Sequence, residues 1–205
     1  NEATLPRYMK TAGYDIAYVG KWHLGSRPDE PLHGPVPLER RGGFDGYWVG
    51  AELPEFTSNS RAGWLYDRND EKVEFDEYRV DAFTRFALQY LDQRLEDKPF
   101  FLVLSYVEPH QQSYRKTHYR GPDPGRLEDM TGLLRGFMCY EGPDEEKASV
   151  KSPAVPPDLE PEIGHWVVAA RDYLASCKRI DRNVKLLLER LDDLKIRENT
   201  LLIYA

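Results

Sequence analysis

Two basic side chains stand two residues apart near the start of the chain, inside a glycine-bounded turn. Lys21 and His23 belong to the segment Gly20-Lys21-Trp22-His23-Leu24-Gly25, which follows a short apolar stretch at residues 16–19. If the backbone stays extended there, side chains two residues apart point the same way. Lys21 and His23 would then face one pocket, and Trp22 would face away. An ammonium and an imidazole placed in this manner suit a ligand with anionic oxygens.

A third basic side chain, His110, follows a second apolar stretch. Residues 100–106 read Phe-Phe-Leu-Val-Leu-Ser-Tyr, and unbroken apolarity of this length is typical of a strand covered on both faces in a parallel sheet. In open α/β sheets, ligands bind outside the carboxyl ends of the strands. If the two stretches are parallel strands of one sheet, Lys21, His23 and His110 lie along the same edge.

The elements that must position these residues follow from apolar periodicity and from turn residues. We expect, in chain order, a short helix ending before Gly13, a strand at 15–19, a long loop over 27–57, a hairpin over 64–75, a helix over 78–95, the strand at 100–106, an irregular region over 111–161, a helix over 164–194 and a third buried strand at 200–204. Alternating strands and helices predict an α/β fold with a mostly parallel sheet flanked by helices.

Net charge and the length of apolar runs indicate which classes of partner to expect. The 205 residues carry a formal net charge of −7, with acidic and basic residues interspersed. A nucleic-acid-binding protein would show a basic face, so we expect no nucleic-acid partner, and an anionic substrate must be captured by a local cluster. No apolar run reaches membrane-spanning length, which favours a soluble protein without a membrane partner. Residues 1–10 lack the apolar segment of a signal peptide, and the compartment (exported or cytoplasmic) and oligomeric state stay open.

Other polar residues carry no spacing signal for a site. Cys139 and Cys177 lack metal-ligand spacing and cannot form a disulfide framework, so we expect two free thiols. For the remaining candidates we expect structural or solvated roles, and these are Arg40, Arg41, His118, His165 and Asp181.

The chain resembles the sulfatase family of the alkaline-phosphatase-like superfamily. The resemblance is carried by Gly13-Tyr14 with the turn at residues 20–25, and by residues 100–110. It implies an alkaline-phosphatase-like α/β fold and a sulfuric ester hydrolase, such as an arylsulfatase, acting on a small-molecule or glycan sulfate ester. It further implies that Lys21 contacts a sulfate oxygen, that His23 bonds the nucleophile or the sulfate, and that His110 donates to the leaving oxygen or the sulfate.

The family mechanism also implies parts that these residues do not supply. Sulfatases use a formylglycine nucleophile, made from a Cys or Ser in a Cys/Ser-x-Pro-x-Arg motif, together with a calcium ion bound by Asp and by Asn or His. Neither motif occurs in the sequence. We therefore interpret residues 1–205 as the central part of a sulfatase catalytic domain, with long loops or insertions at 27–75 and 107–162. We expect calcium in the full-length parent only, with its ligands outside this chain, and we expect the fragment alone to be inactive.

Two alternatives stay open on these residues. A phosphonate or phosphate ester hydrolase of the same superfamily could share the fold and the Gly-Lys-x-His turn, and its nucleophile would differ. A non-catalytic module could keep the same residues as a sulfate-binding pocket. The second alternative predicts sulfate binding in a parent protein that lacks a nucleophile.

Overall fold

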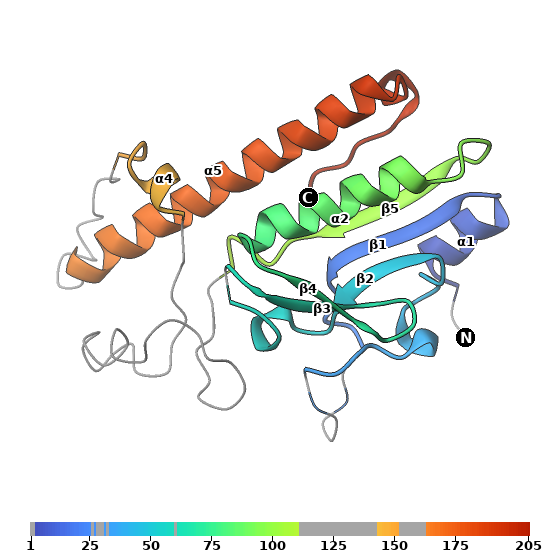
Figure 1. The fold of residues 1–205 in the computed structure, drawn as a ribbon, viewed down its shortest axis with the longest axis horizontal. Helices are drawn as coiled ribbons and strands as arrows, with labels where there is room; N and C mark the ends of the chain where they lie inside the picture. Colours follow the sequence, from blue (N-terminus) through green and yellow to red (C-terminus); the bar gives the residue numbers. More distant parts are fainter. Residues whose placement is uncertain are drawn as a thin grey trace.

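A five-stranded mixed sheet in the order β4-β3-β2-β1-β5 forms the centre of the molecule (Figure 1). The computed structural model describes residues 3–25, 27, 31, 33–59, 61–110, 143–151 and 163–205. Strand β1 (Asp15–Lys21) pairs in parallel with β2 (Tyr47–Ala51) and β5 (Phe100–Ser105), whereas β3 (Gly63–Asp67) and β4 (Lys72–Phe75) form an antiparallel hairpin that extends the sheet beyond β2. The predicted α/β class and the predicted hairpin are both confirmed.

Register places the carboxyl ends of three strands together. In the parallel ladders, Lys21 of β1 lies opposite Ala51 of β2, and Gly20 lies opposite Ser105 of β5. Gly20 has a φ of +112°, and a Cβ atom there would lie 1.9 Å from the carbonyl oxygen of Ser105. Only glycine therefore allows the end of β1 to approach β5 this closely.

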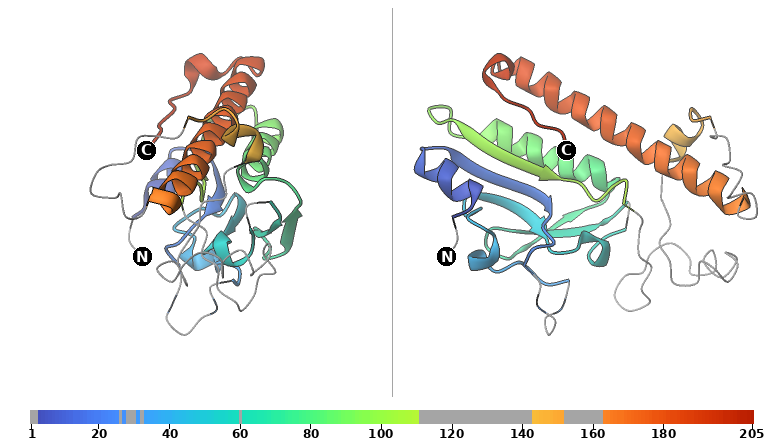
Figure 2. Two further views of the ribbon diagram at one scale, coloured as in Figure 1. Left: turned by 90° about the vertical axis from the view of Figure 1, so that its left-hand side faces the viewer. Right: turned by 180° about the vertical axis from the view of Figure 1, so that it is seen from behind.

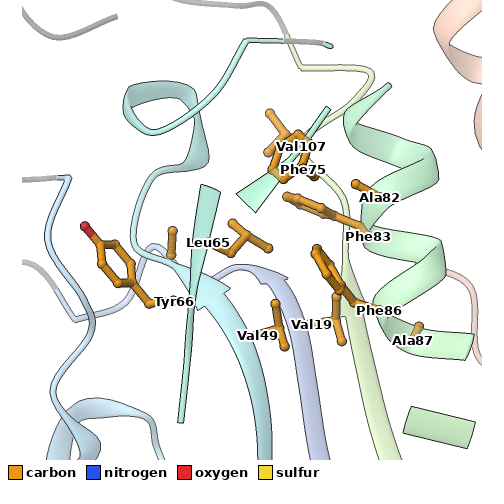
Figure 3. Packing of buried hydrophobic residues seen from close by; sticks show 11 residues of the cluster. Val19, Val49, Leu65, Tyr66, Phe75, Ala82, Phe83, Phe86, Ala87 and Val107 are labelled. Atoms are coloured by element: carbon orange, nitrogen blue, oxygen red, sulfur yellow. The ribbon is translucent and has the colours of Figure 1, made fainter. Parts of the chain in front are cut away.

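Helices cover both faces of β1. Helix α2 (Arg79–Gln93) packs on one face, where Val19 shares a buried cluster with Phe83, Phe86 and Ala87 of the helix (Figure 3). The long helix α5 (Ile163–Asp193) contacts α2 on that same side (Figures 1 and 2). Both helices confirm the periodicity-based prediction.

The opposite face of β1 carries an aromatic cluster. Ile16 and Tyr18 alternate with Ala17 and Val19 along the strand, and they pack against Phe44 and Trp48. Helix α1 (Leu5–Thr11) contacts the strand, as predicted for the short helix before Gly13. Short helices complete the description: η1 (Leu38–Arg40), η2 (Pro54–Phe56), α4 (Asp144–Lys147) and η4 (Arg197–Asn199).

The predicted long loop over 27–57 is wrong at residues 47–51, which form β2. Glycines at 46 and 50 make this segment resemble a turn-forming sequence. In the structure they allow the backbone to pack closely against β1. A Cβ at Gly46 would lie 2.2 Å from the carbonyl oxygen of Ile16 on the neighbouring strand. The expected solvation of Arg41 is wrong too, because this residue is 1% exposed, donates from Nε to the Val36 carbonyl at 2.8 Å and lies 4.8 Å from the Trp48 ring centroid.

The predicted buried strand at 200–204 is also wrong. These residues form no ladder with any strand in the described part of the chain, and Leu201, Ile203 and Tyr204 are 86%, 79% and 76% exposed. A strand requires a neighbour to pair with, and apolar sequence alone does not supply one. For the same reason β5, at the edge of the described sheet, is half-buried rather than covered on both faces.

Some of the expectations concern parts of the chain that are not described. His118 and Cys139 lie outside the described residues, as does the side chain of His165. Cys177 is a half-buried free thiol, as predicted, and Asp181 is exposed on α5. Among the described helices, none combines the length and apolarity needed to cross a membrane.

Candidate active site

The predicted lysine sits at the last position of β1 and faces a buried carboxylate. Lys21 Nζ forms an ion pair with Oε1 of Glu55, which belongs to the short helix η2 just after β2. The two side chains are 15% and 4% exposed. Because this pair is largely removed from water, it holds the ammonium group of Lys21 in one place.

The same carboxylate oxygen also faces the predicted histidine. His110 follows β5 and its Nδ1 lies 3.7 Å from Oε1 of Glu55. Its backbone N–H donates to the Val107 carbonyl at 2.9 Å, which closes the turn after the strand. Since the His110 side chain is 47% exposed, the imidazole is accessible to a ligand. Three parallel strands thus bring Lys21, Glu55 and His110 together at one sheet edge.

His23 occupies a different position from the one that an extended backbone predicts. Strand β1 ends at Lys21, and His23 has a φ of +53° in the left-handed region. Trp22 faces the aromatic cluster, as predicted, with its ring 5.1 Å from that of Tyr18. The His23 imidazole is exposed and makes no hydrogen bond or ion pair with the residues that the structure describes. The prediction that Lys21 and His23 share one orientation is therefore not met by this backbone.

A second buried carboxylate fixes the turn that carries these residues. The backbone N–H groups of Trp22 and His23 donate to the carbonyls of Ala51 and Glu52, both at 2.9 Å. Both carboxylate oxygens of Glu52 lie 3.1 Å from the N–H of Gly25, and the side chain of Glu52 is buried. The turn is therefore held by main-chain and side-chain bonds from the segment after β2.

A buried tyrosine also stabilises the start of this turn. The Tyr18 hydroxyl donates to the carbonyl oxygen of Lys21. Burial raises the pKa of Tyr18 to about 12, against an ordinary value of 10.0. This phenol therefore stays neutral at physiological pH and acts as a hydrogen-bond donor at the end of β1.

The family model described as Sulfatase matches residues 1–205, which is the whole chain. The chain belongs to the sulfatase family. This finding agrees with the family resemblance of the Lys21 turn and the His110 segment.

Curated sulfatases match the chain over part of their own lengths. It is 27% identical over 206 residues to an ulvan-active sulfatase of Formosa agariphila, and the match covers all of this chain and 34% of the relative. It is 35% identical over 120 residues to the sulfatase YidJ of Escherichia coli, covering 54% of this chain and 23% of the relative. The chain thus spans about a third or less of these relatives' lengths.

Solved structures support the same fold. A sulfatase, yidJ, from Bacteroides fragilis superimposes with a TM-score of 0.68 at 20% identity, covering 98% of this chain and 42% of the other. A structure in complex with D-glucosamine-2-N,6-O-disulfate gives a TM-score of 0.59 at 19% identity, covering 98% and 48%. At such identities these likenesses establish the architecture alone.

Glu55 is the site residue that sequence reasoning missed. A carboxylate beside a predicted anion pocket looks unfavourable, and the turn residues within 27–57 predict a loop. If residues 47–51 had been predicted as a strand, Glu55 would have followed a strand end in the same manner as Lys21 and His110. A correct prediction of β2 would therefore have identified Glu55 as a candidate site residue.

The described residues do not form a calcium site by themselves. No group of three or more His, Cys, Asp or Glu side chains in this part of the chain is arranged to hold a metal ion. Calcium prefers six to eight oxygen ligands, and Glu55 is already engaged by Lys21.

Proposed function

We propose that the protein containing this chain hydrolyses sulfate esters, and that Lys21 and His110 bind the sulfate group. The observation that carries the proposal is the convergence of these two side chains on Glu55 at the carboxyl edge of the sheet, in a chain of the sulfatase family. Parallel strand ends are where ligands bind in α/β folds. The formylglycine nucleophile and the calcium ion belong to the same proposal, and both would come from outside residues 1–205.

Each basic side chain has a distinct proposed role. Lys21 acts as a point charge on a sulfate oxygen, because its ammonium is fixed at the end of β1. His110, with its Nδ1 toward Glu55, presents Nε2 to the leaving oxygen or the sulfate as a hydrogen-bond donor. His23, exposed on the adjacent turn, bonds the nucleophile or the sulfate. Stabilisation of developing charge by fixed groups of this kind is a large part of catalysis.

We further propose a sulfated sugar as the substrate class. The chain is 25% identical over 140 residues to an N-acetylglucosamine-6-O-sulfatase of Bacteroides thetaiotaomicron, which covers 63% of this chain and 22% of the relative. The ulvan-active relative is likewise named for a sugar polymer substrate. These two names support a glycan sulfate ester.

The test uses the full-length protein with calcium present. Sulfate release from 6-O-sulfated N-acetylglucosamine and from 4-nitrophenyl sulfate is measured for the wild type and for Lys21→Ala, His110→Ala and the control Lys185→Ala, whose side chain is 74% exposed on α5. We expect the first two substitutions to lower kcat/KM by about 100-fold or more. The control should match the wild type.

The alternatives appear as distinct outcomes. Turnover of phosphate or phosphonate esters without sulfate release would overturn the proposal in favour of the related hydrolases. Sulfate binding by calorimetry without turnover of any ester would identify a binding module instead. Sulfate affinity that is unchanged in Lys21→Ala would remove Lys21 from the site.

A further inference from the structure

Two loops carry the groups that meet at the candidate site, and they come from different strands. The Glu55 loop, residues 54–58, follows β2, and the His110 loop, residues 107–110, follows β5. Strand β1 lies between β2 and β5 in the sheet. The ladders of β1 with β2 and β5 hold the two strands, but Glu55 and His110 lie beyond the strand ends, where a contact between the two loops can set their spacing.

Arg79 makes that connection. It is the first residue of α2, and it is 1% exposed. Its Nε donates to Oε1 of Glu108 at 2.9 Å, and its Nη2 lies 2.8 Å from the same oxygen. Its Nη1 donates to Oγ of Ser58 at 3.1 Å. One guanidinium thus reaches both loops at once.

The two partners are themselves buried and tied into their loops. Ser58 is 0% exposed, and its hydroxyl donates to the Pro54 carbonyl at 2.7 Å, which closes the Glu55 loop. Glu108 is 7% exposed and lies two residues before His110. A shift of Ser58 therefore moves the loop that carries Glu55, and a shift of Glu108 moves the loop that carries His110.

We propose that Arg79 is a positioning residue, which sets the distance between Glu55 and His110 by bracing their loops. The inference rests on the proposed sulfatase function for its kinetic consequences. A guanidinium suits this task because its donors are held in a rigid planar fork that can serve two partners. A lysine at this position has one nitrogen on a flexible stem, and it cannot reproduce the same brace.

A purely structural role makes a different prediction, and a paired substitution separates the two. Removing Arg79 alone leaves the buried carboxylate of Glu108 without its cation. An unpaired buried charge destabilises a fold whatever the function of the protein. Replacing both partners of a buried ion pair by apolar groups of similar size is often neutral for stability. Arg79→Met with Glu108→Leu therefore removes the brace while avoiding an unpaired buried charge.

The experiment compares four forms of the full-length protein: wild type, Arg79→Met, the double variant Arg79→Met/Glu108→Leu, and the control double variant Arg85→Met/Glu77→Leu. The control removes another Arg–Glu pair near the start of α2, with a 2.7 Å contact and side chains 39% and 35% exposed. Thermal unfolding, kcat and KM for a sulfate ester, and the Kd for inorganic sulfate are measured for each form.

We expect the double variant to regain most of the Tm that Arg79→Met loses, while its kcat/KM stays at least about tenfold below that of the wild type. The control should keep both quantities. Recovery of stability together with full kcat/KM in the double variant would overturn the inference, because bracing would then be dispensable for the site.

Two further measurements keep the inference testable if a variant unfolds or the proposed function fails. If the double variant does not fold, Arg79→Lys keeps the charge toward Glu108, and unchanged kcat/KM in that variant would overturn the inference. If the wild type hydrolyses no sulfate ester, the proposed function fails and the distance is measured directly. A crystal structure of Arg79→Lys should show Nδ1 of His110 farther than 3.7 Å from Oε1 of Glu55, and an unchanged distance would refute the brace.

Discussion

Nδ1 of His110 lies 3.7 Å from Oε1 of Glu55, the same oxygen that pairs with Lys21. A carboxylate that is 4% exposed therefore stands where the proposed sulfate group must approach its two basic ligands. Near a protein surface, like unit charges about 4 Å apart repel by about 4 kcal/mol. Under the proposed function, Glu55 competes with sulfate for Lys21 and limits how tightly the inorganic sulfate product binds.

Glu55→Gln should strengthen the binding of inorganic sulfate. The amide keeps the size of the side chain but removes the charge that neutralises Lys21, so the Kd for sulfate should fall on the order of tenfold. In sulfate-free buffer the variant should be less stable by about 1–3 kcal/mol, since Lys21 loses its partner. Added sulfate should then raise the Tm of the variant more than that of the wild type.

Calorimetry and thermal unfolding in a sulfate series check this expectation, with Glu39→Gln as the control. Glu39 is exposed on η1, and in the described part of the chain no hydrogen bond or ion pair joins it to Lys21, Glu55 or His110. An equal response of Tm to sulfate in Glu55→Gln and wild type would show that Glu55 does not compete for the pocket.

His23 offers a prediction about backbone strain at the site. Its φ of +53° lies in the left-handed region, which costs a residue with a Cβ about 1–2 kcal/mol relative to glycine. His23→Gly and His23→Ala both remove the imidazole, so both should lose the same activity if His23 contacts the sulfate or the nucleophile. His23→Gly should nevertheless be the more stable by about 1 kcal/mol.

Chemical unfolding of the two His23 variants measures the difference in free energy. If the alanine variant proves as stable as the glycine variant, the left-handed turn is not present in solution. Unequal activities would separate the backbone effect from the loss of the imidazole.

Local patterns in the sequence predicted the elements whose burial is periodic or continuous. The stripe on α2 and the apolar runs of β1 and β5 each specify an element and a buried face. The placement of Lys21 and His110 at one edge then followed from the parallel pairing of their strands. Residues 200–204 show the limit of such patterns, because a strand needs a partner that an apolar run does not specify.

The parts that sequence reasoning missed depend on contacts between distant residues. Strand β2 was not predicted because glycines in and beside it are typical of turns. In the structure these glycines allow close packing of the backbone. Glu55 and Arg79 acquire their roles only after the ends of β2 and β5 and the start of α2 meet. Their partners lie from 21 residues away, for Arg79 and Ser58, to 55 residues away, for Glu55 and His110, so no local periodicity connects them.

Burial of the Tyr18 phenol predicts how stability changes at alkaline pH. Its pKa is raised to about 12 in the fold, against 10.0 for the ordinary phenol, chiefly because burial disfavours the charged form. Between these values the unfolded state binds fewer protons, so the contribution of Tyr18 is fully present below pH 10 and is lost as the pH rises toward 12. Tyr18→Phe should therefore lose less stability than the wild type over this interval.

Urea unfolding at about pH 9 and about pH 11 measures that change for both proteins. Other tyrosines, such as the half-buried Tyr106, whose pKa burial also raises to about 12, keep a part of the pH dependence in the variant. Equal losses in wild type and Tyr18→Phe would place the Tyr18 hydroxyl in water.

Gly20→Ala tests the contact between the two strands that carry Lys21 and His110. A Cβ at Gly20 would meet the Ser105 carbonyl oxygen at 1.9 Å, in a backbone with a φ of +112°. Relief requires separating β1 from β5, so the substitution should cost about 3 kcal/mol or more. It should also lower kcat/KM, because Lys21 follows directly on the displaced position. Gly34→Ala is the matched control, since its Cβ would lie 3.6 Å from the nearest atom, the Pro31 carbonyl oxygen, which is an ordinary van der Waals distance. Unfolding and turnover of the two variants give the comparison, and equal stability of Gly20→Ala and Gly34→Ala would contradict the close approach of β1 to β5.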